Sequence, residues 1–137
     1  MKNYLKAEFD AKSVNEGLAR IIVAGFIMPL DPTIEQMADV KTAVSEAVTN
    51  AIIHGYEERE GKVFVELELF DRLLTVKIED KGIGILDVQQ AREPLYTSKP
   101  ESERSGMGFT VMESFMDTLH IISEHGEGTT VIMTKQL

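Results

Sequence analysis

The sequence contains no cysteine, no apolar run long enough to cross a bilayer and no excess of basic charge. The absence of cysteine excludes disulfides, thiolate nucleophiles and zinc–thiolate sites. The longest apolar stretch, residues 21–30, is interrupted by Gly25 and Pro29 and falls short of the ~20 residues that a transmembrane helix needs. Charged residues also break the first ten positions, which a signal peptide would not allow. We therefore expect a cytoplasmic protein without a membrane-spanning segment.

The charge balance is acidic. The 137 residues include 14 Lys and Arg against 23 Asp and Glu, which gives a formal net charge of −9 at pH 7. The field of such a surface repels nucleic-acid phosphates and anionic lipids, so we expect no direct nucleic-acid partner. A chain of this length buries one core but not two. We therefore expect a single domain over residues 1–137.

Hydrophobic periodicity predicts an α+β fold. Residues 5–9 alternate between apolar and polar side chains, and so do residues 63–69 and 74–78 around a turn at Asp71 and Arg72, as in a β-hairpin. Further strands are predicted at 120–123 and 130–134. Helices are predicted at about 14–28, at 32–54 and from about Gly106 onward. This order favours an α/β protein of the α+β two-layer type, with a mostly antiparallel mixed sheet and three helices on one face.

The first predicted helix is apolar on both sides. Ser13 with Glu16 matches a capping box and predicts its start. Its expected core face consists of Leu18, Ile21, Ile22, Gly25 and Phe26. Ala19 and Val23 make the opposite side apolar too, so this helix needs cover on both sides.

The second predicted helix begins with Asp31 as N-cap before Pro32 and stops at Gly55. The following segment, GYEEREGKV, is not a P-loop. It has five residues between its glycines, and Val63 stands where a Ser or Thr should hold magnesium. The GIG at residues 82–84 is not a Rossmann loop either, because it has no third glycine and no helix follows directly.

Three clusters of residues remain that could support chemistry. In SEAVTNAIIHG, Glu46 and Asn50 are four residues apart and share one helical face. Glu46 could accept a proton, and the Asn50 carbonyl suits a hard cation such as Mg²⁺. The alternative is a solvated pair of polar side chains.

The second cluster is DKGIG, where Asp80 ends a strand and Gly82 and Gly84 follow. The carboxylate could accept a hydrogen bond from an exocyclic amine, although a plain turn explains the pattern as well. In the third cluster, ERSGMGFT, Gly106 and Gly108 lead into a helix whose N-terminus favours a phosphate.

Together and in this order, the clusters resemble the N box and the two glycine boxes of the ATPase superfamily that includes gyrase, Hsp90, histidine kinases and MutL. HGEGTTV near the C-terminus resembles that superfamily's Gly-Thr strand entry. SEAVTNAIIHGY, SGMGF and the short domain look most like the anti-sigma factor serine kinases, over nearly the whole chain. The resemblance implies a Bergerat-type ATP-binding fold.

The resemblance also implies roles for individual residues. Glu46 would be the general base, Asn50 would coordinate Mg²⁺, and Asp80 would accept a hydrogen bond from the adenine amino group of ATP or ADP. Gly82 and Gly84 would shape the adenine pocket.

Residues 86–105 correspond to the ATP lid. Main-chain groups of Gly106, Met107 and Gly108, beside Ser105, would contact the phosphates. Lys99 and Arg104 are candidates for phosphate or partner contacts, or are solvated loop charges. Either Thr129 or Thr130 would close the adenine side.

The resemblance implies a protein serine kinase that is also an anti-sigma factor with a role in sporulation. It would sequester a sigma factor (sigma F-like) and phosphorylate a serine of an anti-anti-sigma factor. It also implies a homodimer, with Arg20 on the first helix as a candidate partner contact. Two alternatives remain open: a detached histidine-kinase catalytic domain, and a non-catalytic module that uses nucleotide only to shape its partner surface.

Overall fold

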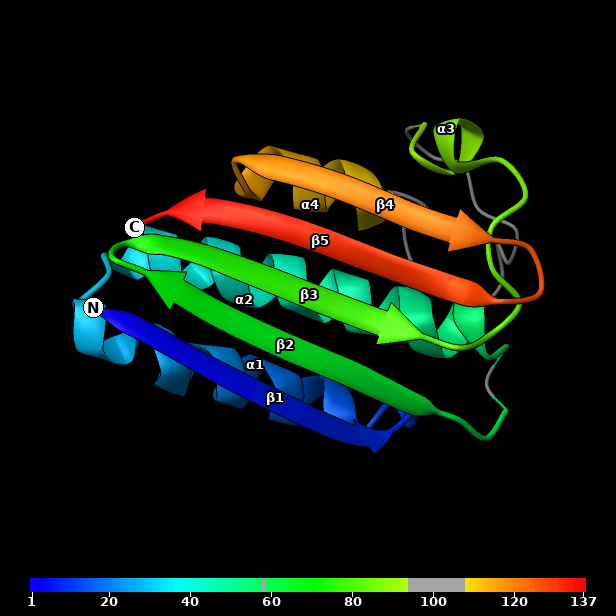
Figure 1. The fold of residues 1–137 in the computed structure, drawn as a ribbon, viewed down its shortest axis with the longest axis horizontal. Helices are drawn as coiled ribbons and strands as arrows, with labels where there is room; N and C mark the ends of the chain where they lie inside the picture. The colour runs from blue at the N-terminus through cyan, green and yellow to red at the C-terminus, as the bar shows by residue number, and fades with distance from the viewer. Residues whose placement is uncertain (58, 94–107) are drawn as a thin grey trace.

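The computed structural model describes residues 1–57, 59–93 and 108–137, which form one five-stranded sheet and a layer of helices (Figure 1). The strands are β1 (Lys2–Asp10), β2 (Lys62–Phe70), β3 (Leu73–Asp80), β4 (Thr118–Glu124) and β5 (Gly128–Gln136). The helices are α1 (Asn15–Ile27), α2 (Ile34–Asn50), α3 (Val88–Ala91) and α4 (Gly108–Phe115), with a 3-10 turn at Met28–Leu30 and a π-helix at Ala51–Gly55.

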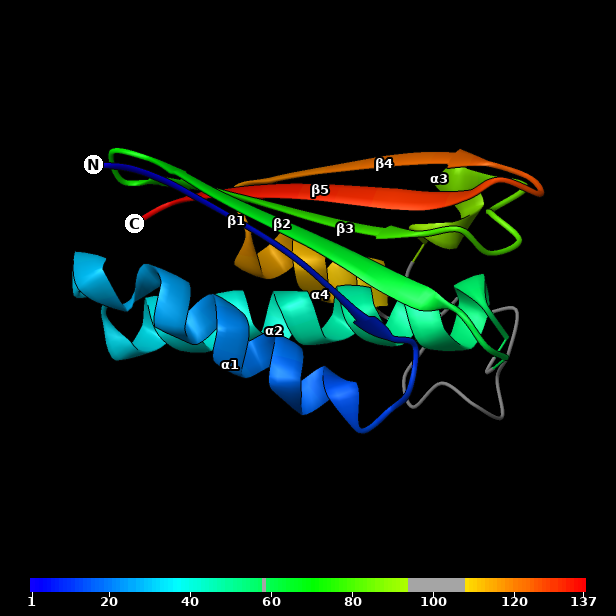
Figure 2. The ribbon, with the colours of Figure 1, turned by 60° about the horizontal axis from the view of Figure 1, so that its bottom comes forward.

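The strand order is β1-β2-β3-β5-β4, and all four pairings are antiparallel. Helices α1, α2 and α4 lie on one face of this sheet, with α2 between the other two (Figure 2). The prediction of a two-layer α+β fold with three helices on one face is therefore confirmed. The sheet is not mixed, however, because in the described residues no pair of strands runs parallel.

The core lies between the sheet and the helices. Alternation along β2 and β3 buries one side chain in two, among them Leu67 and Val76, against Val44 and Val48 of α2. Each such side chain contributes about 1.5–3 kcal/mol when it is fully buried. None of the described helices is both long and apolar enough to cross a membrane.

The expected core face of α1 is partly wrong. Leu18 and Ile21 are 43% and 71% exposed, whereas Ala19 and Val23, which were assigned to the opposite side, are buried. The small Ala19 side chain lies on the buried side of α1, whereas Leu18 and Ile21 point outward. Phe26 is buried, as predicted.

Both predicted N-caps are also wrong. Ser13 makes no side-chain cap for α1, and the carboxylate of Glu16 bonds to α1 and α2 side chains instead. Asp31 adopts a left-handed conformation with φ of 51°. The cap of α2 is Thr33, whose hydroxyl accepts the Gln36 N–H at 3.0 Å, while the Gln36 side chain accepts the Thr33 N–H at 2.9 Å.

The end of the second helix differs from the prediction in its geometry. The α-helix ends at Asn50, and the chain continues as a π-helix in which the Tyr56 N–H donates to the Ala51 carbonyl at 3.0 Å. The wider turn changes the direction in which His54 and Gly55 project. Such π-turns occur frequently at functional sites.

Candidate functional site

A cavity of about 260 Å³ lies where the end of α2, the loop after β3, the first turn of α4 and the start of β5 meet. Its lining includes Asn50, His54, Asp80, Gly84, Gly108 and Thr129. Four segments that are distant in the sequence thus bring the three predicted clusters and the HGEGTTV motif to one place.

Asp80 is the buried charged group of this cavity. Its residue is 5% exposed, and its carboxylate accepts the Gly82 N–H at 2.9 Å and a further hydrogen bond from the Thr129 N–H. Burial raises the pKa of Asp80 to about 6, although the two N–H donors act in the opposite direction. The group is therefore mostly ionised at neutral pH, and it can accept a hydrogen bond from a ligand amine.

Glycines allow the end of α2 to contact the loop after β3. A Cβ on Gly55 would lie 2.6–2.8 Å from the Asp80 carboxyl atoms, and one on Gly82 would lie 1.9 Å from the Gly55 carbonyl oxygen. That oxygen accepts the Ile83 N–H at 2.8 Å, and the Ile83 carbonyl accepts the Gly126 N–H at 2.5 Å. The loop is therefore held on both sides by backbone hydrogen bonds, and this wall of the cavity is preformed.

The two threonines at the start of β5 lie on opposite faces of the sheet. Thr129 is buried and lines the cavity, and its hydroxyl is 2.9 Å from the Ser123 hydroxyl. Thr130 points to the other face, where its hydroxyl donates to Glu79 at 3.4 Å. Of the two, Thr129 lines the cavity and Thr130 does not.

Glu46 and Asn50 lie one turn apart on α2, and both are half-buried. Asn50 lines the cavity, whereas Glu46 is not among its lining residues, although the adjacent Ala47 is. The described residues contain no group of three or more His, Asp or Glu side chains that could hold a metal.

Gly108 begins α4 and lines the cavity. The other predicted phosphate contacts lie outside the described residues; they are Lys99, Arg104, Ser105, Gly106 and Met107. Of the expected lid, residues 86–93 are described and include α3.

Several lining residues were not predicted. The π-turn places His54 on the cavity wall, as the β4–β5 turn does for His125. Apolar lining by Ile83 and Phe109 was also missed. The only sequence signal for these residues was their position beside the motif glycines.

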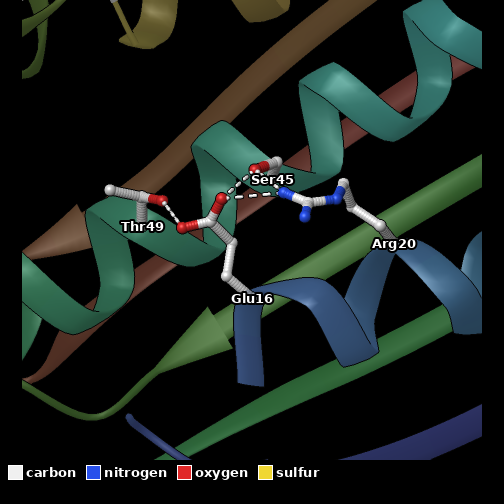
Figure 3. A network of polar contacts seen from close by, with 4 residues as sticks. All are labelled: Glu16, Arg20, Ser45 and Thr49. Atoms are coloured by element: carbon white, nitrogen blue, oxygen red, sulfur yellow. Dashed lines mark hydrogen bonds and ion pairs between the residues drawn. The ribbon is translucent and has the colours of Figure 1, made fainter. Parts of the chain in front are cut away.

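Arg20 lies away from the cavity, in a polar network between α1 and α2 (Figure 3). Its guanidinium donates to Glu16 at 2.9 Å and to the Ser45 hydroxyl at 3.1 Å. The Glu16 carboxylate also accepts the hydroxyls of Ser45 at 2.5 Å and Thr49 at 2.9 Å. The Arg20 side chain remains 42% exposed, so it is fixed in orientation and open to solvent.

Comparison with known proteins agrees with this geometry. The model of the histidine kinase-like ATPase domain matches residues 11–135. The chain belongs to this family. It is also similar to curated relatives over their whole length. It is 59% identical to the anti-sigma F factor of Clostridium perfringens (strain SM101) over 138 residues, which cover 100% of this chain and 99% of the relative.

The anti-sigma F factor of Clostridium novyi is 60% identical over 136 residues, which cover 98% of this chain and 95% of the relative. That of Bacillus subtilis is 56% identical over 138 residues, which cover 100% of this chain and 94% of the relative. The resemblance stated from the four motifs is thus confirmed at the level of the family. A histidine kinase-like ATPase domain is also consistent with the observed sheet and helix layers.

Proposed function

We propose that this protein is an ATP-dependent protein serine kinase that also acts as an anti-sigma factor. The observation that supports this most directly is the cavity in which the buried Asp80 carboxylate, Asn50 and the start of α4 face a common space. The names of the similar proteins, anti-sigma F factors, support the regulatory role. In this proposal residues 1–137 form one kinase domain, with an ATP lid at about 86–105.

Asp80 recognises the adenine base in this proposal. Its ionised carboxylate accepts a hydrogen bond from the 6-amino group, and the apolar side chains of Ile78, Ile83 and Val131 contact the base from the cavity wall. The absence of a Cβ at Gly82 and Gly84 lets the loop pack against the Gly55 and Glu124 carbonyls, which shapes this wall of the proposed adenine pocket. The residues present therefore fit an adenine nucleotide.

In this proposal phosphoryl transfer uses side chains of α2 and the start of α4. Glu46 accepts the hydroxyl proton of the acceptor serine. The Asn50 carbonyl would hold Mg²⁺, and the ion would supply positive charge to the phosphates. The free N–H groups at the start of α4, with Gly106 to Gly108, support the phosphates. Lys99 and Arg104 supply further positive charge.

The proposed protein partners are a sigma factor (sigma F-like) and an anti-anti-sigma factor that receives the phosphate. Arg20 is a natural contact for either partner, because the network with Glu16 and Ser45 holds its guanidinium in one orientation at the surface. The acidic net charge of −9 also suits a basic DNA-binding partner.

A second copy of this chain is a further proposed partner. The exposed side of α1 and its ends present apolar side chains at Val14, Leu18, Ile21 and Met28. Their spacing places them along one stripe of the helix, and a Cβ on Gly25 would have no neighbour within 4 Å. This stripe is the proposed homodimer surface.

The proposal is tested by calorimetric titration with ATP, with and without Mg²⁺, followed by transfer of radiolabelled phosphate to an anti-anti-sigma protein. We expect magnesium-dependent binding and an acid-stable phosphoserine. Glu46→Gln should abolish transfer while ATP still binds. Transfer by this variant at the wild-type rate would refute the general-base assignment. Binding without any transfer to serine would favour the non-catalytic module, and acid-labile phosphate would favour a histidine kinase.

A further inference from the structure

The hydrogen-bond ladder between β2 and β3 stops next to Asp80, and a side chain continues it. The register pairs Phe64 with Glu79, so extending it would place Lys62 opposite Lys81. The Tyr56 hydroxyl lies between these two strands. It donates to the Lys62 carbonyl at 2.6 Å and accepts the Lys81 N–H at 2.8 Å. The phenol therefore bridges the strands where the backbone ladder opens.

Tyr56 is also tied to the end of α2. Its N–H closes the π-helix on the Ala51 carbonyl at 3.0 Å. The preceding residue, Gly55, contacts the Asp80 carboxylate and accepts the Ile83 N–H at 2.8 Å. Two successive residues thus hold the loop after β3 by two hydrogen bonds, from the Lys81 N–H and the Ile83 N–H, while Gly55 packs against the Asp80 carboxylate.

The Tyr56 ring has little freedom to move. A Cβ on Gly61 would lie 2.4–2.6 Å from three ring carbons, so the backbone at Gly61 is packed against the ring. The hydroxyl uses one donor and one acceptor function on backbone groups, which fixes its orientation.

We propose that Tyr56 is a positioning residue that sets the place of Asp80 and Gly82 relative to the end of α2, and thereby the selectivity for a purine with a 6-amino group. This inference rests on the proposed adenine contact of Asp80. Tyr56 does not line the cavity and acts through the segment that it holds. Without the Tyr56 bridge, the end of β3 becomes more mobile, and the Asp80 carboxylate oxygen that accepts the hydrogen bond from the 6-amino group is no longer held in one position.

The test compares two ligands, ATP and purine riboside triphosphate, which lacks the 6-amino group. Tyr56→Phe retains the ring and removes the bridge. We expect this variant to bind ATP about three- to tenfold more weakly, the range of one hydrogen bond. Its affinity for purine riboside triphosphate should remain that of the wild type. Tyr4→Phe, which removes the hydroxyl of a tyrosine that is 51% exposed on β1, is the matched control and should leave both affinities unchanged.

Equal weakening of both nucleotides would show a general structural role and would overturn the inference, as would unchanged affinity for ATP. Should Tyr56→Phe fold poorly, Gly61→Ala displaces the ring from the other side and should give the same selective loss.

Amide hydrogen exchange in the nucleotide-free protein separates this inference from the proposed function. Exchange of the Lys81 N–H should be faster in Tyr56→Phe than in the wild type. If the wild type shows no preference for ATP over purine riboside triphosphate, the adenine role of Asp80 fails and the inference about selectivity fails with it. Faster Lys81 exchange would then show that the error lies in the ligand assignment and not in the bridge.

Discussion

Replacing Asp80 with Asn should stabilise the nucleotide-free protein while it removes ATP binding. The carboxylate is buried, and its charge is therefore poorly solvated in the folded state. Asn has nearly the same shape and carries no charge. The cost of burying the charge should therefore appear as a gain in stability in the variant.

The size of the gain follows from the pKa. Burial raises the pKa of Asp80 from an ordinary 3.8 to about 6, and one pKa unit corresponds to about 1.4 kcal/mol. The ionised group therefore costs the folded state about 3 kcal/mol. Asn can accept only one of the two N–H groups of Gly82 and Thr129, which offsets about 1 kcal/mol. The expected net gain is about 2 kcal/mol at pH 7.

The gain should depend on pH in a defined direction. Because the folded state binds this proton more tightly than the unfolded chain does, ionisation of Asp80 lowers stability as pH rises from about 4 to about 6, and the cost is constant above that. The advantage of Asp80→Asn should thus be complete at pH 7–8 and shrink as the pH falls through 6. Other carboxylates titrate in both proteins, so their effects cancel in the comparison.

Thermal unfolding of nucleotide-free wild type and variant at pH 8, 7, 6 and 5 measures this difference. For a chain of 137 residues, about 2 kcal/mol corresponds to a Tm increase of about 7 °C. Calorimetry with ATP on the same samples should show binding only in the wild type. A variant that is less stable at pH 7, or whose advantage is the same at pH 5, would refute the assignment of a desolvated carboxylate.

Two further variants test other contacts. Gly55→Ala should weaken ATP binding by more than about tenfold and destabilise the protein by about 1–3 kcal/mol, because the new methyl group would overlap the Asp80 carboxylate. Calorimetry measures the affinity, and thermal unfolding measures the stability. A variant with wild-type affinity for ATP would contradict the close packing of Gly55 against Asp80. Ile21→Glu should convert the proposed homodimer to a monomer in sedimentation velocity experiments without a change in ATP affinity, because Ile21 is 71% exposed on α1 and far from the cavity lining. A wild type that already sediments as a monomer at micromolar concentration would remove the basis for the dimer.

The sheet could be predicted because its strands have one buried and one solvated face. Leu67 and Val76 alternate with polar neighbours, and this period-2 pattern specifies both the strand and its inner face. The face of α1 could not be predicted in the same way. Large side chains at Leu18 and Ile21 and small ones at Ala19 and Val23 make the helix apolar all round, so hydrophobicity alone does not tell which side meets α2.

The N-cap of α2 shows a different limit. Asp31 and Thr33 are both good capping residues within three positions, and local chemistry did not distinguish them. Thr33 is the cap because the Gln36 side chain also accepts the Thr33 N–H, which completes a capping box. Asp31 instead forms part of the turn before the helix. For α1, Glu16 was available for a cap, but its carboxylate has an arginine and two hydroxyls within reach from α1 and α2, and these contacts are visible only in the fold.

The parts of the candidate site that could be predicted are those where a motif contains a polar side chain, as at Asn50 and Asp80. The parts formed by backbone contacts could be predicted much less well. Gly55 was interpreted as a helix stop, which explains a glycine but not why it must lie against Asp80. A period of 3.6 residues cannot show a π-turn, since the turn adds a residue without changing the apolar pattern. That added residue brings Gly55 to the carboxylate and Tyr56 to the open end of the β2–β3 ladder. The position of this cavity wall therefore depends on contacts of uncharged backbone groups. A search of the sequence for chemically active side chains does not find such contacts.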